Sequence, residues 1–226
     1  MSTVKTALIT GASRGVGAAL ARALAPTHRL VLGGRDRAAL DALAAELPGA
    51  TVWPVELTSV TAADLPELDR LDVLVHSAGV VRLGSVADTP ARVWRDTYEV
   101  NVVAVAELTR LLLPALRAAS GHVVCVNSGA GLNANAGWGS YAASKFAMRA
   151  FADVLRQEEP GLRVTTVYPG RIATDMQRSV REQEGEEFEP SNYLEADSVA
   201  RAIVAALEAG PDAHLTDLTL RPRPRS

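Results

Sequence analysis

The stretch TGASRGVG occupies residues 10–17 and directly follows the apolar run VKTALIT at residues 4–10. The apolar run predicts a buried strand, and the alanine-rich segment at 15–25 has the spacing of a helix. Gly11, Gly15 and Gly17 therefore lie between a strand and a helix. Glycines at such a turn let a pyrophosphate approach closely, and the following helix N-terminus offers free N–H groups and a favourable dipole. The position predicts a dinucleotide-binding turn, with a plain strand–helix turn as the alternative.

The rest of the chain alternates in the same way. Near-continuous runs of Val, Leu and Ile are typical of strands buried on both faces of a parallel sheet. They occur at 28–34, 50–57, 71–79, 121–128, 162–170 and 214–220, and helical spacing occurs at 37–46, 90–118, 139–158 and 196–209. This order predicts a single α/β domain over 1–226: a doubly wound (Rossmann) parallel seven-stranded sheet with helices on both faces, in three αβα layers.

The composition limits the partners and the compartment. The 226 residues include 48% hydrophobic and 22% charged residues, and the net charge is −3. This balance gives no reason to expect nucleic acid or an anionic membrane as a partner. A lone cysteine, Cys125, fits a reducing compartment and a buried strand position better than a nucleophile. With no secretion signal and no spanning apolar run, we expect a cytoplasmic protein, and no cluster at metal-ligand spacing suggests a metal.

The end of the second predicted strand bears on the choice of dinucleotide. The stretch LVLGGRDR at 30–37 places Gly34 where an acid could hold a ribose hydroxyl, and Arg35 follows it. Arg14, inside the glycine turn, can approach the same place, and two guanidinium groups suit a 2′-phosphate. The charges favour NADP(H) over NAD(H). Two exposed surface arginines, or Asp36 directed at a ribose, remain alternatives.

The stretch YAASK at 141–145 places Tyr141 and Lys145 four residues apart, on one face of a predicted helix. The pair alone is compatible with simple packing. A free phenol titrates near 10, and a nearby ammonium lowers that pKa, so the same spacing also suits acid–base chemistry. Ser128 ends a predicted strand thirteen residues before Tyr141.

These motifs together resemble the classical short-chain dehydrogenase/reductase family over residues 4–220. TGASRGVG resembles its cofactor turn, HSAG (76–79) its N-N-A-G segment, and YAASK its Y-x-x-x-K signature. NVVAVAELT (101–109) resembles the segment that carries an active-site asparagine, and YPGRIAT (168–174) resembles P-G-x-x-x-T. His76 departs from the family asparagine, and Glu56 replaces a more usual aspartate.

The resemblance implies an oxidoreductase that transfers hydride between NADP(H) and a carbonyl or secondary alcohol. Tyr141 is then the general acid or base, Ser128 holds the substrate oxygen, Lys145 binds the ribose and lowers the tyrosine pKa, and Asn101 holds a water. The implied cofactor contacts are Gly11, Ser13, Arg14, Gly15, Val16, Gly17, Arg35, Glu56, Leu57, Ala78, Gly79, Asn101, Tyr141, Lys145, Pro169, Gly170, Ile172 and Thr174. A nucleotide-binding regulator without turnover is the alternative.

Three further expectations concern the periphery. The stretch 175–195 is expected to be a substrate-covering loop, with the acidic run at 181–190 solvated, and 221–226 a flexible tail. Trp138 either borders the substrate pocket or packs elsewhere. The apolar surfaces of the helices at 90–118 and 139–158 predict a homotetramer or homodimer.

Overall fold

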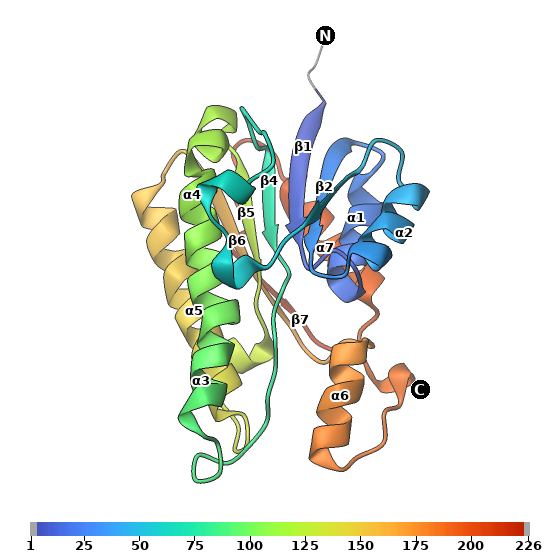
Figure 1. Ribbon diagram of the computed structural model, residues 1–226, viewed down its shortest axis with the longest axis vertical. Coiled ribbons are helices and arrows are strands. Elements are labelled where there is room, and N and C mark those ends of the chain that lie inside the picture. The colour runs from blue at the N-terminus through green and yellow to red at the C-terminus, as the bar shows by residue number, and fades with distance from the viewer. Residues whose placement is uncertain (1–3, 224–226) are drawn as a thin grey trace.

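The sheet lies at the centre of the molecule in the computed structural model, which describes residues 4–223 (Figure 1). Its seven strands are all parallel in the order β3-β2-β1-β4-β5-β6-β7. The bounds are β1 (Lys5–Thr10), β2 (His28–Gly34), β3 (Thr51–Pro54), β4 (Val73–His76), β5 (His122–Val126), β6 (Arg163–Pro169) and β7 (Asp217–Leu220). The predicted fold class is confirmed.

Helices cover both faces of the sheet and bury a separate apolar core on each. One core joins the sheet to α1 (Gly15–Leu24), α2 (Arg37–Glu46) and α7 (Ala196–Leu207). The other joins it to α4 (Ala104–Ala119) and α5 (Gly139–Glu158), and it contains the fully buried Cys125. Figure 1 shows these groups on opposite sides of the strands. Within residues 4–223, no helix is long and apolar enough to cross a bilayer.

The strand order reverses between β1 and β4, and this reversal positions the site. The chain moves outward from β1 to β3 and returns to β4 on the other side of β1. At this junction the Thr10 hydroxyl donates to the Val75 carbonyl at 3.2 Å and accepts the Ser77 N–H at 3.1 Å. In open α/β sheets, such a switch point opens a crevice at the carboxyl ends of the strands.

The predicted helix at 90–118 is interrupted. It consists of α3 (Ala91–Tyr98), a π-helical turn η3 (Glu99–Val103) and α4. A wider turn re-aims the side chains that follow it, and Asn101 lies inside this one, fully buried. Shorter 3-10 turns are η1 (Leu57–Ser59), η2 (Ala62–Asp64), η4 (Gly129–Gly131) and η5 (Pro190–Asn192).

The prediction of a solvated loop for the acidic run is wrong for its first residues. Residues 181–184 form the last turn of α6 (Asp175–Glu184), and Glu184 is ion-paired with Arg171 and Arg181. Thr174 caps the helix by accepting the Gln177 N–H, and Gly185 ends it at φ +71°. These caps and ion pairs, together with the good helix propensity of Gln, Arg and Glu, stabilise the helix.

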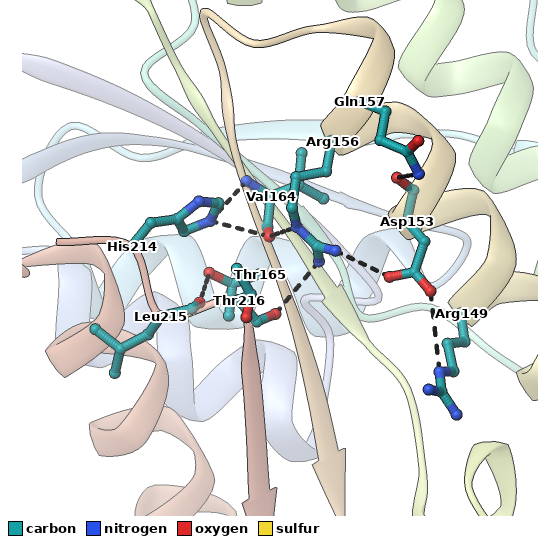
Figure 2. Close-up of polar contacts among 9 residues, drawn as sticks. All are labelled: Arg149, Asp153, Arg156, Gln157, Val164, Thr165, His214, Leu215 and Thr216. Carbon is teal, nitrogen blue, oxygen red and sulfur yellow. Dashed lines mark hydrogen bonds and ion pairs between the residues drawn. The ribbon is translucent and has the colours of Figure 1, made fainter.

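Side chains from α5 and from the segments on either side of the edge strand β7 contact the backbone of β6. Arg156 of α5 donates to the Val164 carbonyl at 3.1 Å and pairs with Asp153, while the His214 ring contacts the Val164 backbone at 3.0 Å (Figure 2). Beyond β7, Arg221 donates to the Tyr168 carbonyl at 2.9 Å. Residues 224–226 of the predicted flexible tail lie outside the described residues.

Candidate active site

The glycine turn has the backbone that its sequence predicts. Gly11 and Gly15 have φ of +64° and +57°, a region that L side chains rarely adopt. A Cβ on Gly11 would lie 2.8 Å from the Ala78 backbone, so this glycine lets the turn after β1 approach the segment after β4. A Cβ on Gly17 would overlap the Gly11 carbonyl, so Gly17 packs α1 against the turn.

A single cavity of about 970 Å³ extends from this turn to the carboxyl ends of β4, β5 and β6. It is at the upper end of the size of ligand pockets. Of the predicted site residues, those that line it are Gly11, Ser13, Arg14, Gly15, Val16, Arg35, Glu56, Leu57, Ala78, Gly79, Ser128, Tyr141, Lys145, Pro169, Gly170, Ile172 and Thr174. Gly17 and Asn101 do not line it, since one packs within the turn and the other is buried behind the cavity wall.

Charged side chains gather at the β2 end of the cavity. Arg14 and Arg35 both line it, and an Arg35 guanidinium nitrogen lies 3.7 Å from the Glu56 carboxylate in an exposed pair. The Asp36 carboxylate accepts the Ala39 N–H at 3.0 Å and caps α2. Asp36 is therefore engaged at the helix terminus, and the two arginines are available to an anion.

Tyr141 lies at the other end of the cavity and is 8% exposed. Burial raises the pKa of its phenol, while a hydrogen bond from the Ser128 side chain lowers it. The net direction is opposite to the lowering expected from Lys145. The Ser128 hydroxyl also accepts the Ala130 N–H at 3.1 Å, which fixes its orientation beside the tyrosine.

Lys145 is 3% exposed, and its ammonium lies 5.8 Å from the centroid of the Tyr141 ring. It donates to the Val126 carbonyl at 3.1 Å. Burial lowers the pKa of Lys145 to about 8. A Cβ on Gly79 would lie 3.8 Å from this nitrogen, so a glycine at that position keeps the cavity open beside the lysine.

Asn101 is a structural support of this end of the site. Its amide accepts the Val80 N–H and donates to the Val80 carbonyl, both at 2.9 Å, and it also donates to the Ser144 hydroxyl at 3.0 Å. The side chain therefore joins the π-turn to the loop after β4 and to α5. His76 takes a similar supporting part, because its ring lies 2.8 Å from the Thr109 hydroxyl on α4.

Asn127 was missed by sequence reasoning. Its amide donates to the Lys145 carbonyl at 3.0 Å and accepts the Ser128 N–H at 2.8 Å. It thereby fixes the strand end that carries Ser128 against the helix that carries Tyr141 and Lys145. Its place beside Ser128 was the available signal.

The walls around Tyr141 come from three segments. Val81, Val180 and Tyr141 form one apolar cluster, against which Leu83, Ala130 and Trp138 pack. Trp138 borders the cavity and meets the Tyr141 ring edge-on at 5.8 Å, which supports the first of its two predicted placements. Arg171, also missed, lies 5.6 Å from the Trp138 ring and binds Glu184 through two hydrogen bonds.

The tyrosine end of the cavity is bridged by α6. The Gln183 side-chain oxygen accepts the Leu83 N–H at 3.0 Å, which connects α6 to the loop after β4. An isolated bridge between Gly84 and Trp138 connects that loop to the start of α5. The segment 175–195, expected as a loop, thus presents a helix to the cavity.

A doubly wound sheet, a glycine turn at its switch point and a Ser–Tyr–Lys group in one cavity, with Tyr141 and Lys145 buried, are typical of nucleotide-dependent oxidoreductases. The family profile described as short chain dehydrogenase matches residues 5–185. The chain therefore belongs to the short-chain dehydrogenase/reductase family.

Individual relatives agree with this assignment. The chain is 34% identical over 237 residues to glycine betaine reductase ATRR of Emericella nidulans; the match covers 97% of this chain but only 19% of that much longer protein. An alcohol dehydrogenase from Thermococcus sibiricus, complexed with 5-hydroxy-NADP, superposes with a TM-score of 0.86 at 28% identity, covering 98% of this chain and 99% of the other. A short-chain dehydrogenase from Shigella flexneri 2a, complexed with NADP, gives 0.85 at 27% identity, covering 96% of both chains.

Proposed function

We propose that this protein is an NADP(H)-dependent oxidoreductase that interconverts a carbonyl compound and a secondary alcohol, with Tyr141 as general acid and base. The observation that carries the proposal is that Ser128, Tyr141 and Lys145 line the same cavity as the glycine turn. A buried phenol with a neighbouring hydroxyl suits proton transfer to a developing alkoxide.

The residues present fit a dinucleotide. A Cβ at Gly11 would meet the Ala78 backbone, so the cradle depends on glycine, and the N-terminus of α1 faces the cavity. Arg14 and Arg35 would hold a 2′-phosphate, and Lys145 the nicotinamide ribose. The two NADP-complexed structures of related proteins support this preference. When bound, the cofactor supplies the hydride.

The chain's own groups then handle the proton. In reduction, Tyr141 donates its phenolic proton to the substrate oxygen, while the Ser128 hydroxyl donates a hydrogen bond to the same oxygen. The Lys145 ammonium, 5.8 Å from the ring centroid, stabilises the phenolate that remains. Asn101 positions the loop after β4 and α5 through its side-chain amide. We also propose that the Asn101 backbone holds a water. In oxidation, Tyr141 accepts the proton.

The test combines cofactor binding with turnover. We expect NADPH to bind in a fluorescence titration more tightly than NADH, and a panel of ketones and aldehydes to yield at least one substrate that oxidises NADPH. Tyr141→Phe keeps NADPH affinity within about threefold and lowers kcat by about 10²–10⁴-fold. Tyr98→Phe, outside the cavity lining, is the matched control with normal turnover. Binding without turnover on the whole panel would favour the regulator instead, and failure to bind either nucleotide would contradict both.

We also propose that the protein is a cytoplasmic homotetramer or homodimer. Val103, Phe146 and Val154 are large apolar side chains left at least 40% exposed, at the end of η3 and on α5. Such exposed apolar residues favour burial against another copy. Light scattering after size exclusion is expected to give a mass of two or four times 23.8 kDa, and a mass of 23.8 kDa would contradict the proposal.

A further inference from the structure

One face of α6 runs along the cavity from its phosphate end to its tyrosine end. Thr174, Gln177 and Val180 follow one another at intervals of three residues, so each lies next to the one before it, and all three line the cavity. A Cβ on Gly15 would lie 3.4 Å from the Thr174 methyl group, so the face begins over the glycine turn. It then reaches Val180, which packs in one cluster with Tyr141 and Val81.

Gln177 lies in the middle of this face, between Thr174 and Val180. It is 7% exposed and lines the cavity, yet its side-chain nitrogen has no hydrogen-bond partner among residues 4–223. By contrast, Gln183 on the same helix accepts the Leu83 N–H, and Gln157 on α5 donates to the Asp153 carbonyl. Buried amide groups are nearly always paired, so an unpaired one beside a cavity indicates a missing ligand atom that accepts a hydrogen bond.

The position of Gln177 favours the substrate over the cofactor as the source of that acceptor. Gln177 lies one helical turn, about 5 Å, from the level of Val180 and Tyr141. Apart from Ser128 and Lys145, which belong to the proposed catalytic group, the side chains that cluster with Tyr141 are the apolar Val81, Leu83, Ala130, Trp138 and Val180. A small number of polar groups in an apolar pocket fix the orientation of a ligand and determine its specificity.

Resting on the proposed function, we propose that Gln177 is a specificity-determining residue. Its amide donates a hydrogen bond to a second oxygen of the substrate, a few bonds from the reacting carbonyl. The site therefore selects carbonyl compounds that carry an additional acceptor oxygen, such as a keto ester, over simple ketones of the same size.

The test uses a matched ligand pair and a readout other than turnover. Ethyl acetoacetate and 2-heptanone have main chains of equal length, and only the first has ester oxygens. Dissociation constants of both are measured by calorimetry on the full-length protein saturated with NADP⁺. We expect the wild type to bind ethyl acetoacetate at least tenfold more tightly, and Gln177→Leu to abolish this preference. Gln157→Leu, on the exposed end of α5, is the matched control that keeps it.

Other results would overturn the inference. These are equal affinities in the wild type, no binding of either ligand, or equal weakening of both ligands by Gln177→Leu. A parallel loss of NADP⁺ affinity in Gln177→Leu would assign the amide to the cofactor and overturn the substrate role. Turnover is measured separately. If the ligand preference and its loss are found but no carbonyl is reduced, the proposed function fails while the role of Gln177 stands.

Discussion

The Lys145 ammonium donates a hydrogen bond to the Val126 carbonyl oxygen at 3.1 Å, and no acidic side chain pairs with it anywhere in residues 4–223. The lysine of α5 is thus held at the carboxyl end of β5 with a single backbone partner and a Met148 sulfur at 3.8 Å. A buried cation with so few partners destabilises the folded state. This arrangement is suited to an active site and unfavourable for stability.

Replacing Lys145 with Met is therefore expected to stabilise the protein and abolish turnover. The native pKa of Lys145 is about 8, whereas the unfolded value is near 10.5. Between these values the unfolded chain binds more protons, so the free energy of unfolding of the wild type rises with pH, by at most about 1.4 kcal/mol per pH unit. Urea unfolding from pH 7 to 10 measures this. The variant is expected to be more stable at pH 7, with the difference shrinking as the pH rises. A constant difference would contradict the pKa argument.

Asn101 is expected to contribute more to stability than to the proton path. Asn101→Ala removes three buried hydrogen bonds to Val80 and Ser144, and should lower the free energy of unfolding by about 2–4 kcal/mol. Asn101→Asp keeps an oxygen that accepts the Val80 N–H. Below the pKa of the new carboxyl, this variant should therefore lose less free energy of unfolding than Asn101→Ala. Chemical denaturation measures both, with Asn133→Ala at an exposed position as the control. A large loss of kcat with unchanged stability would instead support a direct part in proton transfer.

Acid should destabilise the protein through two buried histidines. Burial lowers the pKa of His76 and of His122 to about 3, below the unfolded value near 6.5. The unfolded chain binds protons first, so stability falls as the pH drops from about 6.5 towards 3, by up to about 1.4 kcal/mol per pH unit for each histidine. The slope of unfolding free energy against pH should be shallower in His76→Asn and His122→Gln, whatever the absolute stability. An unchanged slope in both variants would refute this account.

Cofactor choice should depend on Arg35. Arg35→Ala is expected to weaken NADPH at least tenfold more than NADH, because only NADPH carries the 2′-phosphate that a guanidinium binds. Glu56→Gln removes the carboxylate 3.7 Å from Arg35 and should strengthen NADPH binding severalfold. Fluorescence titrations of both nucleotides test this, and Arg37→Ala, which pairs with Asp41 outside the cavity, is the matched control. Equal losses for both nucleotides in Arg35→Ala would show that Arg35 does not contact a 2′-phosphate.

Most of the fold could be predicted because its signals are local. Buried parallel strands are continuous apolar runs, and the glycine turn requires φ values that its residues reveal. The helices at 37–46 and 139–158 were predicted with the bounds that the structure has. The interruption at η3 could not be predicted, since it depends on what Asn101 contacts across the chain at Val80 and Ser144.

Site residues that belong to a sequence motif could be predicted. Site residues whose part depends on contacts between distant segments of the chain could not. Tyr141, Lys145 and Ser128 follow a sequence spacing, whereas Asn127 and Arg171 become recognisable only from their contacts with Lys145, Trp138 and Glu184. Burial raises the pKa of Tyr141 in the structure, and this effect could not be predicted, because the sequence shows the neighbouring cation but not the burial. Helix α6 was not predicted, although the sequence contains its T-x-x-Q cap and its terminal glycine. The acidic composition of the run indicated a solvated loop, whereas these capping residues indicate a helix.

The hydrogen bond that connects α6 to the loop after β4 has two unlike partners. Gln183 contributes a side chain to it, but Leu83 contributes only its backbone N–H. Any residue except proline at position 83 can therefore preserve the contact, whereas a residue at position 183 preserves it only if its side chain carries an acceptor oxygen at a similar reach. Because Leu83 also packs on the Tyr141 cluster, its side chain can be enlarged or trimmed to reshape the cavity without severing α6 from the loop. Position 83 is thus a natural place to retune substrate size in a designed variant, and position 183 is one to leave untouched.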